Sequence, residues 1–336
     1  MMIYIRNDST EPAYNLAFEE WVFENLRDDD YVLFWRNDNA IIVGRNQNTV
    51  SEINAQYVEE HGIHVIRRET GGGAVYHDLG NLNFSIISDA QDLRELDFSL
   101  FTLPVMKALE KLGIDAALTG RNDLTIDNMK FSGIAQRQKK GRVLNHGTLL
   151  FDSNLSVLSA CLNPRKEKIH SKGIRSVAAR VTNIRPYLKK ELDILAFRDL
   201  LLEAMFEEQG RISERVLTEE ELMQIQKLRD EKYATTEWNF GRSPKAEIHN
   251  YRYFPGVGGL EIYAQVEKNR LIKINFFGDF FAPEHKEILE GYLAGTQFQP
   301  SAVRDKLNRV ELSRYIGNID SGELIALLFE EQKKEK

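Results

Sequence analysis

Residues 67–84 read Arg-Arg-Glu-Thr-Gly-Gly-Gly-Ala-Val-Tyr-His-Asp-Leu-Gly-Asn-Leu-Asn-Phe, which places three consecutive glycines between a basic pair and a short apolar segment. Glycine adopts positive φ and lets an anion approach the main-chain N–H groups. Arginine supplies a permanent charge and the forked donors that phosphate and carboxylate oxygens accept. A hairpin turn with a glycine bulge would explain the glycines alone. It would not explain the arginines before them or the His-Asp and Asn-Leu-Asn after them, so we interpret the stretch as an anion-binding loop.

The composition is that of a soluble globular protein. The chain has 336 residues, which is enough for two domains. Of these residues, 42% are hydrophobic and 28% are charged. A single cysteine, Cys161, excludes an internal disulfide framework and fits a reducing compartment. The N-terminus does not resemble a signal peptide, and no run of 18 apolar residues could span a membrane. We therefore expect a cytoplasmic protein with no membrane partner.

Charge is distributed unevenly along the chain. Between Lys130 and Lys190, fourteen Lys or Arg residues are opposed only by Asp152 and Glu167. This segment carries +12 and the remainder −19, for a net charge of −7. A basic patch on an acidic protein favours an anionic small molecule or an acidic protein partner. Nucleic acid is not expected, because the remaining charge would repel it.

The pattern of apolar residues predicts many short elements rather than a repeat. Thr10 and Pro12 indicate a helix start, and the polar Glu19, Glu20 and Glu24 indicate its exposed face. A boundary is expected at 238–244, where Gly and Pro follow a helical region. Beyond it, alternation predicts a three-stranded sheet at 247–254, 260–266 and 271–277, covered by helices near 284–293 and 321–331. Before it, strands are expected at 31–35, 40–43, 64–68, 74–76, 82–87, 124–126, 131–136 and 143–151, and helices at 98–112, 155–162, 192–209 and 219–233. Turns are expected at 127–128 and 140–141.

Three further motifs could carry chemistry. Lys130 follows a turn and precedes a Ser-Gly, so its cation could stabilise a phosphate or a developing oxyanion. Asp123 could hold a metal or orient that lysine, although a turn aspartate beside a surface lysine is the simpler reading. His146 enters an apolar strand, where histidines are usually hydrogen-bonded core residues. Residues 166–184 alternate basic, small and hydroxyl residues with apolar ones, as in a loop that closes over an anion.

Several common site types are absent from the sequence. Neither Gly-x-x-x-x-Gly-Lys-[Ser/Thr] nor Gly-x-Gly-x-x-Gly after a strand occurs, so a Walker-type or Rossmann nucleotide site is not expected. The seven histidines lack metal-ligand spacing, which argues against zinc. No Gly-x-Ser-x-Gly elbow is present, and Cys161 lies in an apolar helical context typical of a packing residue.

Taken together, these motifs resemble the lipoate–protein ligase family over roughly residues 30–245. The resemblance rests on Arg-Arg-x-[Ser/Thr]-Gly-Gly-Gly-Ala-Val-x-His-Asp-x-Gly-Asn, Gly-Arg-Asn-Asp-Leu, Lys-x-Ser-Gly, His-Gly-Thr-Leu-Leu and Ser-Lys-Gly-Ile-x-Ser-Val-x-x-Arg-Val-x-Asn, in that order. It implies an α/β (α+β) fold: a mixed-sheet catalytic domain like that of biotin–protein ligases over 1–243, and a small α+β accessory domain over 246–336.

The resemblance also implies an activity. Members activate lipoate with ATP and Mg²⁺, form lipoyl-AMP, and transfer the lipoyl group to a lysine of an acceptor, here expected to be E2-type lipoyl domains and the glycine cleavage H protein. Lys130 would be the catalytic residue and Asp123 a contact of the Mg²⁺ that accompanies ATP. Lipoate would contact Lys130, Gly73, His77 and His146. The ATP and lipoyl-AMP site would comprise Arg68, Thr70, Gly71, Gly72, Gly73, Ala74, Val75, Tyr76, His77, Asn81, Asp123, Lys130, Arg137 and His146. Val75, Phe84 and residues 149–151 could line the apolar slot for the acyl chain.

Two alternatives remain open. Related proteins transfer octanoyl or lipoyl groups through an acyl-cysteine, a role only Cys161 could fill here. The intact Lys-x-Ser-Gly motif favours the ligase. A non-catalytic sensor of a nucleotide or acyl-adenylate would retain the same loop without modifying any acceptor.

Overall fold

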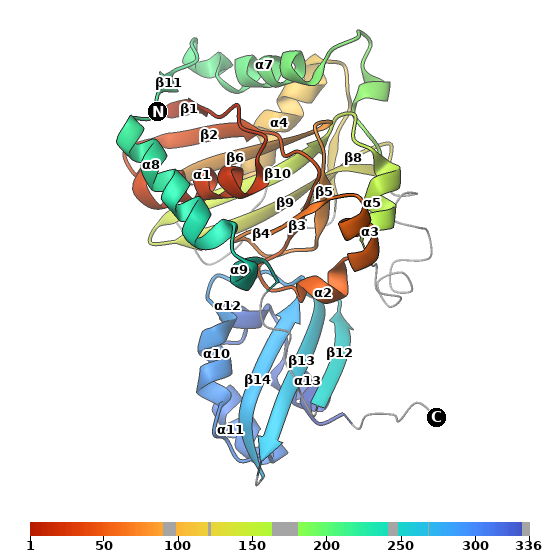
Figure 1. Cartoon of the computed structure of the whole chain (residues 1–336), viewed down its shortest axis with the longest axis vertical. Coiled ribbons are helices and arrows are strands. Elements are labelled where there is room, and N and C mark those ends of the chain that lie inside the picture. Colours follow the sequence, from red (N-terminus) through yellow and green to blue (C-terminus); the bar gives the residue numbers. More distant parts are fainter. Residues whose placement is uncertain (90–98, 120–121, 163–180, 241–247, 268, 331–336) are drawn as a thin grey trace.

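Among the residues that the structure describes, the largest of three sheets forms the centre of the N-terminal part of the molecule. The computed structural model describes residues 1–89, 99–119, 122–162, 181–240, 248–267 and 269–330 (Figure 1). Among these, eight strands pair in the order β11-β1-β2-β6-β10-β9-β8-β7. Their bounds are β11 Glu214–Arg215, β1 Met2–Arg6, β2 Asp30–Trp35, β6 Asn81–Asp89, β10 Arg142–Leu150, β9 Met129–Lys139, β8 Asp123–Ile126 and β7 Ala117–Thr119.

The sheet is mixed, as expected. β1 runs parallel to both β2 and β11, whereas all the other neighbouring strands are antiparallel. The expected turns at 127–128 and 140–141 connect β8 to β9 and β9 to β10. Asp127 and Asn128 have φ of 50° and 63°, and Lys140 and Gly141 have φ of 48° and 76°. Two successive positive φ values are typical of the two-residue hairpin turns that match strand twist.

Helices cover both faces of this sheet, and the alternation of side chains along the strands separates two cores. On β2, Val32 and Phe34 belong to the core beneath α4 (Ser99–Lys111) and α7 (Ile194–Met205). Tyr31, Leu33 and Trp35 point to the opposite core, beneath α1 (Pro12–Asn25) and α8 (Glu219–Leu228). A strand buried on both faces reads as a continuous apolar run, as Tyr31–Trp35 does.

A small second sheet carries the glycine-rich stretch. Its order is β4-β3-β5, with bounds His64–Arg67, Ala40–Val43 and Val75–His77. β3 is parallel to β4 and antiparallel to β5, so the glycines join two strands on opposite sides of β3. An apolar cluster that includes Ile41, Val43 and Cys161 packs this sheet against the short helices α3 (Ala55–Glu60) and α5 (Leu155–Cys161). Helix α2 (Thr49–Glu52) precedes α3.

The C-terminal part has its own sheet and its own core, as predicted. β12 (Ile248–Phe254), β13 (Gly258–Glu267) and β14 (Arg270–Gly278) pair in antiparallel order. One apolar cluster, drawn entirely from residues 254–328, joins them to the helices. These helices are α10 (Lys286–Leu293), α11 (Pro300–Leu307), α12 (Ser313–Ile316) and α13 (Ser321–Leu328), and this part lies below the glycine-bearing sheet in Figure 1.

Some local expectations were wrong. Thr10 is not the helix cap: α1 begins at Pro12, and its N-cap residue is Glu11, whose side chain makes no capping bond. Glu19 does not face solvent either, since it is only 4% exposed and lies inside the protein. Helix α7 is followed by the 3₁₀ turn Glu207–Gln209, and α8 continues into the π-helical turn Arg229–Tyr233, after which comes the short helix α9 (Thr236–Phe240). Another 3₁₀ turn, Arg185–Tyr187, precedes α7.

Within the described ranges, no helix is both long enough and apolar enough to cross a membrane. The expected loop at 166–184 falls largely outside the described residues. Only its end is described, where Val181 forms a parallel bridge to Lys130 and the N–H of Thr182 donates to the carbonyl of Lys130 at 2.8 Å.

Candidate active site

The glycine loop is shaped by a buried guanidinium. Arg68 is 6% exposed and donates from Nη2 to the carbonyls of Gly71 (2.7 Å) and Gly73 (2.9 Å). It also donates from Nη1 to the carbonyl of Ile42 (3.0 Å) and from Nε to Oγ1 of Thr70 (3.0 Å). Burial lowers its pKa to about 10, which leaves it charged at neutral pH. Arg68 therefore holds the loop from within and contributes a positive charge beneath it.

A close backbone approach explains one of the glycines beside the loop. A Cβ on Gly44 would lie 2.0 Å from the carbonyl oxygen of Gly72, which is itself at φ +92°. Arg67 has a different role from its neighbour. Its Nη1 donates to the carbonyls of Gly44, Arg45 and Gln47, and its Nε donates to that of Trp238 in α9. Arg67 thus stabilises the fold around the loop and faces away from the cavity described next.

A cavity of about 150 Å³ lies between the glycine loop and strands β9 and β10. Most of its wall is apolar or glycine, with a few polar side chains among them. Such a cavity suits an apolar ligand with one polar end. Its lining is Leu16, Trp35, Asn37, Ile42, Arg68, Gly72, Gly73, Ala74, Val75, His77, Asn83, Asn122, Lys130, Gly133, Ile134, Ala135, His146, Gly147, Thr148 and Phe281.

A lysine–carboxylate pair lies where this cavity meets the surface. Lys130 Nζ is 2.7 Å from Asp123 Oδ1, and their side chains are 38% and 32% exposed. The two residues come from neighbouring strands, β9 and β8, and the absence of a side chain at Gly133 leaves room for the lysine: a Cβ there would be 3.1 Å from Nζ. The ammonium group is therefore oriented beside the cavity and remains accessible to an anion from solvent.

Behind the cavity wall, a chain of buried polar groups links helix α1 to the glycine loop. The Nδ1 of His146 lies 2.8 Å from Glu19 Oε1, and its Nε2 lies 2.7 Å from Thr70 Oγ1. Because Thr70 accepts from Arg68, its single hydroxyl hydrogen is left for the imidazole. The carboxylate of Glu19 thus fixes the orientation of the His146 ring, and the ring fixes the orientation of the Thr70 hydroxyl. Ser85 donates to the same oxygen of Glu19.

His77 presents a donor to the cavity. Asn37 Nδ2 lies 3.0 Å from its Nδ1, so the amide donates there and Nε2 carries the hydrogen. That Nε2 is buried and has no hydrogen-bond partner within the described part of the chain. Burial, together with the nearby Arg68 charge, lowers the pKa of His77 to about 3, so the ring is neutral at physiological pH. A ligand oxygen in the cavity would satisfy this donor.

The structure brings eight of the expected site residues to the cavity wall, and the others lie elsewhere. Thr70 and Asp123 lie behind or beside it, bonded to His146 and Lys130. Gly71 and Arg137 line a separate cavity, next to the C-terminal part. Tyr76 packs in the apolar cluster around β3, and Asn81 is buried with its Nδ2 donating to Asn83. The eight at the wall are Arg68, Gly72, Gly73, Ala74, Val75, His77, Lys130 and His146.

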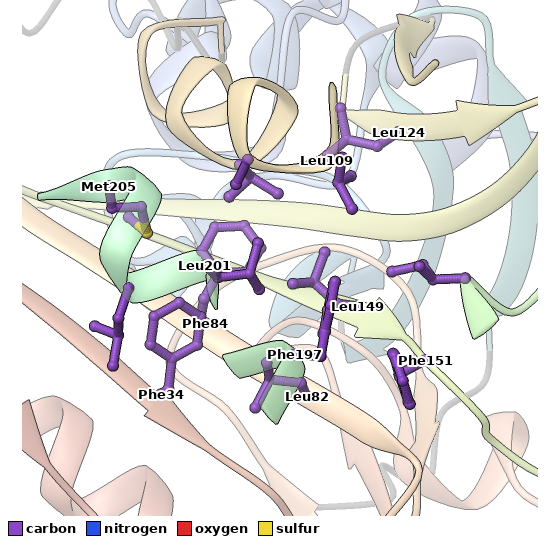
Figure 2. Close-up of a cluster of buried hydrophobic side chains, with 14 of the residues drawn as sticks. Phe34, Leu82, Phe84, Leu109, Leu124, Leu149, Phe151, Phe197, Leu201 and Met205 are labelled. Atoms are coloured by element: carbon purple, nitrogen blue, oxygen red, sulfur yellow. The ribbon is translucent and has the colours of Figure 1, made fainter. Parts of the chain in front are cut away.

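The expected apolar slot was wrong in most of its members. Val75 lines the cavity, but Phe84 and Leu149 point to the other face of the sheet, into the core beneath α4 and α7 (Figure 2). Side chains alternate along a strand, so Asn83 rather than Phe84 faces the cavity. Phe84 has a structural role instead, because its ring fills the space beside Gly147, where a Cβ would be 2.6 Å from the ring.

Comparison with known proteins agrees with this geometry. Residues 11–206 match the family model of the lipoyl protein ligase A/B catalytic domain, and residues 243–328 match that of the bacterial lipoate protein ligase C-terminus. The chain is 42% identical to the lipoate-protein ligase LplJ of Bacillus subtilis, over 98% of this chain and all of that protein. The chain belongs to the lipoate–protein ligase family. It is also 41% identical to lipoate–protein ligase 1 of Staphylococcus aureus, with the same coverage of each chain.

Solved structures, lipoate–protein ligases among them, share the fold. LipL1 of P. falciparum, in complex with lipoate, has a TM-score of 0.78 and 24% identity, covering 93% of this chain and 95% of that one. The bipartite lipoate protein ligase of Thermoplasma acidophilum, described with its E2 lipoyl domain, has a TM-score of 0.63 and 31% identity over 73% and 98%. A lipoate-protein ligase A bound with ATP has a TM-score of 0.61 and 29% identity over 71% and 98%.

The position of the single cysteine disfavours the acyl-cysteine alternative for this ligase family member. Cys161 is completely buried, its Sγ lies 3.7 Å from the carbonyl of Leu158, and it does not line the cavity. Burial raises the pKa of its thiol to about 12, whereas a nucleophilic cysteine must be a thiolate.

We therefore expect Cys161→Ala to retain ATP-dependent ligation, with kcat/KM within about twofold of wild type, because the change is distant from the cavity wall. Steady-state lipoylation of an acceptor domain measures this. A folded Cys161→Ala protein with no activity would restore the transferase alternative.

The sequence did not indicate several residues that lie in the wall of the ligase cavity or behind it. Glu19 has the helical spacing of a solvent-facing residue, and only its contact with His146, 127 positions away, reveals its role. Trp35 ends an apolar strand and Asn37 follows it. The polar residue after the apolar run was the signal in the sequence that could have placed them in the site. Phe281 comes from the C-terminal part, and no local pattern connects it with the glycine loop. The other lining residues missed are Leu16, Ile42, Asn83, Asn122, Gly147, Thr148 and residues 133–135.

Proposed function

We propose that this chain is an ATP-dependent lipoate–protein ligase that makes lipoyl-AMP and passes the lipoyl group to a lysine of an acceptor protein. The observation that carries the proposal is the Lys130–Asp123 pair at the open end of a largely apolar cavity, opposite the glycine loop. An eight-carbon acyl chain fits the apolar wall, and its carboxylate meets the ammonium group at the mouth.

The first step joins the carboxylate to the nucleotide. A carboxylate oxygen of lipoate attacks the α-phosphorus of ATP, the bond to the β-phosphate oxygen breaks, and pyrophosphate leaves with that electron pair. Negative charge gathers on the reacting oxygens, and the cation of Lys130 stabilises it more strongly in a partly desolvated site than in water. The neutral His77 and the backbone of residues 73–75 supply N–H donors, and His146 positions Thr70 and the loop.

The second step needs positioning rather than a protein nucleophile. The acceptor lysine amine attacks the acyl carbon of lipoyl-AMP, AMP leaves, and the amine loses its proton. The adenylate is already activated, so the chain must chiefly hold it and exclude water. This fits a site whose described residues include no activated cysteine.

The remaining assignments rest on the same cavity. Mg²⁺ is taken to arrive with ATP, as part of the substrate, with Asp123 as the carboxylate available to it. The nucleotide would also meet Gly71, Tyr76, Asn81 and Arg137 only through rearrangement, because these four do not line the cavity here. Residues 1–243 would form the adenylating domain and 246–336 the accessory domain. Acceptors would be E2-type lipoyl domains and the glycine cleavage H protein, in the cytoplasm.

The test is the intact mass of a purified lipoyl domain after incubation with the full chain, lipoate and Mg·ATP. We expect a lipoyl mass gain only when ATP is present, together with release of pyrophosphate. A gain from an acylated carrier protein without ATP would assign the chain to the transferases. ATP binding with no modification of either the lipoyl domain or the H protein would instead favour the sensor.

A further inference from the structure

Phe281, in the loop that follows β14, brings the C-terminal part onto the glycine loop. Its ring is 6% exposed and lies against two glycines, where a Cβ on Gly71 or Gly72 would come within 3.3 or 3.1 Å of it. Two hydrogen bonds with Asn46 hold this loop in place. The N–H of Gly278 donates to the carbonyl of Asn46 at 2.7 Å, and Asn46 Nδ2 donates to the carbonyl of Phe280 at 3.4 Å.

Two cavities meet at this ring. The first is the apolar cavity of about 150 Å³ described above, and the second is a cavity of about 1050 Å³ between the N-terminal and C-terminal parts. The second is lined by charged side chains, among them Arg45, Glu69, Lys139 and Arg314. Among the residues that the structure describes, Phe281 alone lines both cavities. The ring is therefore a partition between them.

Strand β9 shows which end of the apolar cavity the partition closes. Lys130, at the start of the strand, and residues 133–135 line the apolar cavity, whereas residues 136–140 line the interdomain cavity. A strand advances about 3.3 Å per residue, so Gln136 lies about 20 Å along the strand from Lys130. The interdomain cavity thus begins beyond the end of the apolar cavity that is distant from Lys130.

We propose that Phe281 limits the length of the acyl chain that this enzyme activates. The inference rests on the proposed function, in which the substrate carboxylate lies at Lys130 and the tail points away from it. The tail then ends against the phenyl ring. A longer chain would have to displace the ring or pass it into the charged interdomain cavity, where its methylene groups would meet Arg and Lys side chains rather than apolar ones.

The proposal assigns a specificity role to the C-terminal part. The ring completes the cavity only while that part is docked on the glycine loop through Asn46, so chain length is sensed in the docked arrangement. Discrimination of one or two methylene groups in an apolar pocket is worth roughly 10–200-fold in kcat/KM. We expect wild type to lose activity by such a factor between octanoate and dodecanoate.

The experiment measures pyrophosphate release by the full chain with Mg·ATP and each of hexanoate, octanoate, decanoate, dodecanoate and lipoate. In Phe281→Ala, we expect the ratio of kcat/KM for dodecanoate to that for octanoate to rise about tenfold. Phe281→Trp should do the opposite and lower octanoate relative to hexanoate. Phe277→Ala is the matched control, because that ring lies on β14, just before the loop that carries Phe281, contacts Tyr263 and lines neither cavity.

The outcomes separate the two proposals. No pyrophosphate release by wild type with any carboxylate, lipoate included, would overturn the proposed function itself. Release with lipoate, but an unchanged chain-length profile in Phe281→Ala and Phe281→Trp, would overturn the role of Phe281 alone. An equal loss for all chain lengths, or the same change of profile in Phe277→Ala, would show that the ring supports packing and does not measure length.

Discussion

Lys130→Ala will lower the rate of lipoyl-AMP formation by about 10²–10³-fold while leaving the fold intact, because a charge-stabilising group at the reacting oxygens typically contributes that much. The lysine side chain is 38% exposed and its ion pair with Asp123 is partly solvated, so its loss costs little stability. Lipoate-dependent pyrophosphate release measures the first step alone. Transfer from supplied lipoyl-AMP measures the second, where the expected loss is smaller since the phosphate charge is already formed.

The same strand offers a matched control for this prediction. Lys139 is 39% exposed and paired with Glu24 at 2.8 Å, so it equals Lys130 in exposure and in having a carboxylate partner. It lines the interdomain cavity and not the apolar one. Lys139→Ala should therefore form lipoyl-AMP at nearly the wild-type rate. Pyrophosphate release by Lys130→Ala at the level of Lys139→Ala would remove Lys130 from the proposed mechanism.

The parts of the fold that local sequence determines were predicted well. The strand at 40–43 has its expected bounds, because a short apolar run ends at Asn39 on one side and Gly44 on the other. The turns at 127–128 and 140–141 contain Asp-Asn and Lys-Gly, residues that tolerate positive φ. The three-stranded C-terminal sheet followed from period-two alternation. In each case the information lies within about ten residues.

The parts that depend on distant partners were not predictable from local pattern. Glu19 looks solvent-facing on a helix, yet it is buried, and its carboxylate accepts hydrogen bonds from His146 on β10 and Ser85 on β6. The pairing of β1 with β11 joins residues 4 and 214, and β11 is only two residues long. Phe84 is an apolar residue of the kind expected in an acyl slot, but its position on β6 directs its ring into the core beneath α4 and α7, on the other face of the sheet. Alternation predicts two faces without telling which face carries the site.

The buried carboxylate within the glycine-rich stretch supports the second large prediction. Glu69 is 8% exposed on its side chain, and its Oε2 lies 3.0 Å from Arg45 Nη1 and 3.9 Å from Arg137 Nη2, while Lys232 donates to its Oε1. Burial alone would raise the pKa of this carboxyl, but Arg137, Arg45 and Lys232 outweigh it and lower the pKa to about 2. Removing the charge would leave these cations partly uncompensated in a buried site.

Glu69→Gln is therefore expected to lower the free energy of unfolding by about 3 kcal/mol at pH 7. In the folded protein the pKa of Glu69 is about 2, below the ordinary value of 4.5 that the unfolded chain has. Stabilisation by the carboxylate is complete above the unfolded pKa and is lost as pH falls toward the folded one. The difference between wild type and variant should shrink by about 1 kcal/mol from pH 7 to pH 4.

Urea unfolding of both proteins at the two pH values measures this difference, and an exposed ion pair supplies the control. Glu231 pairs with Lys227 at 3.8 Å, with side chains 67% and 71% exposed, so Glu231→Gln should change stability by less than about 0.5 kcal/mol at either pH. A Glu69→Gln protein as stable as Glu231→Gln at pH 7 would contradict the network.

Because Glu69 lies directly between Arg68 and Thr70, its loss should also loosen the loop that the cavity needs, and lipoate KM should rise along with the loss of stability.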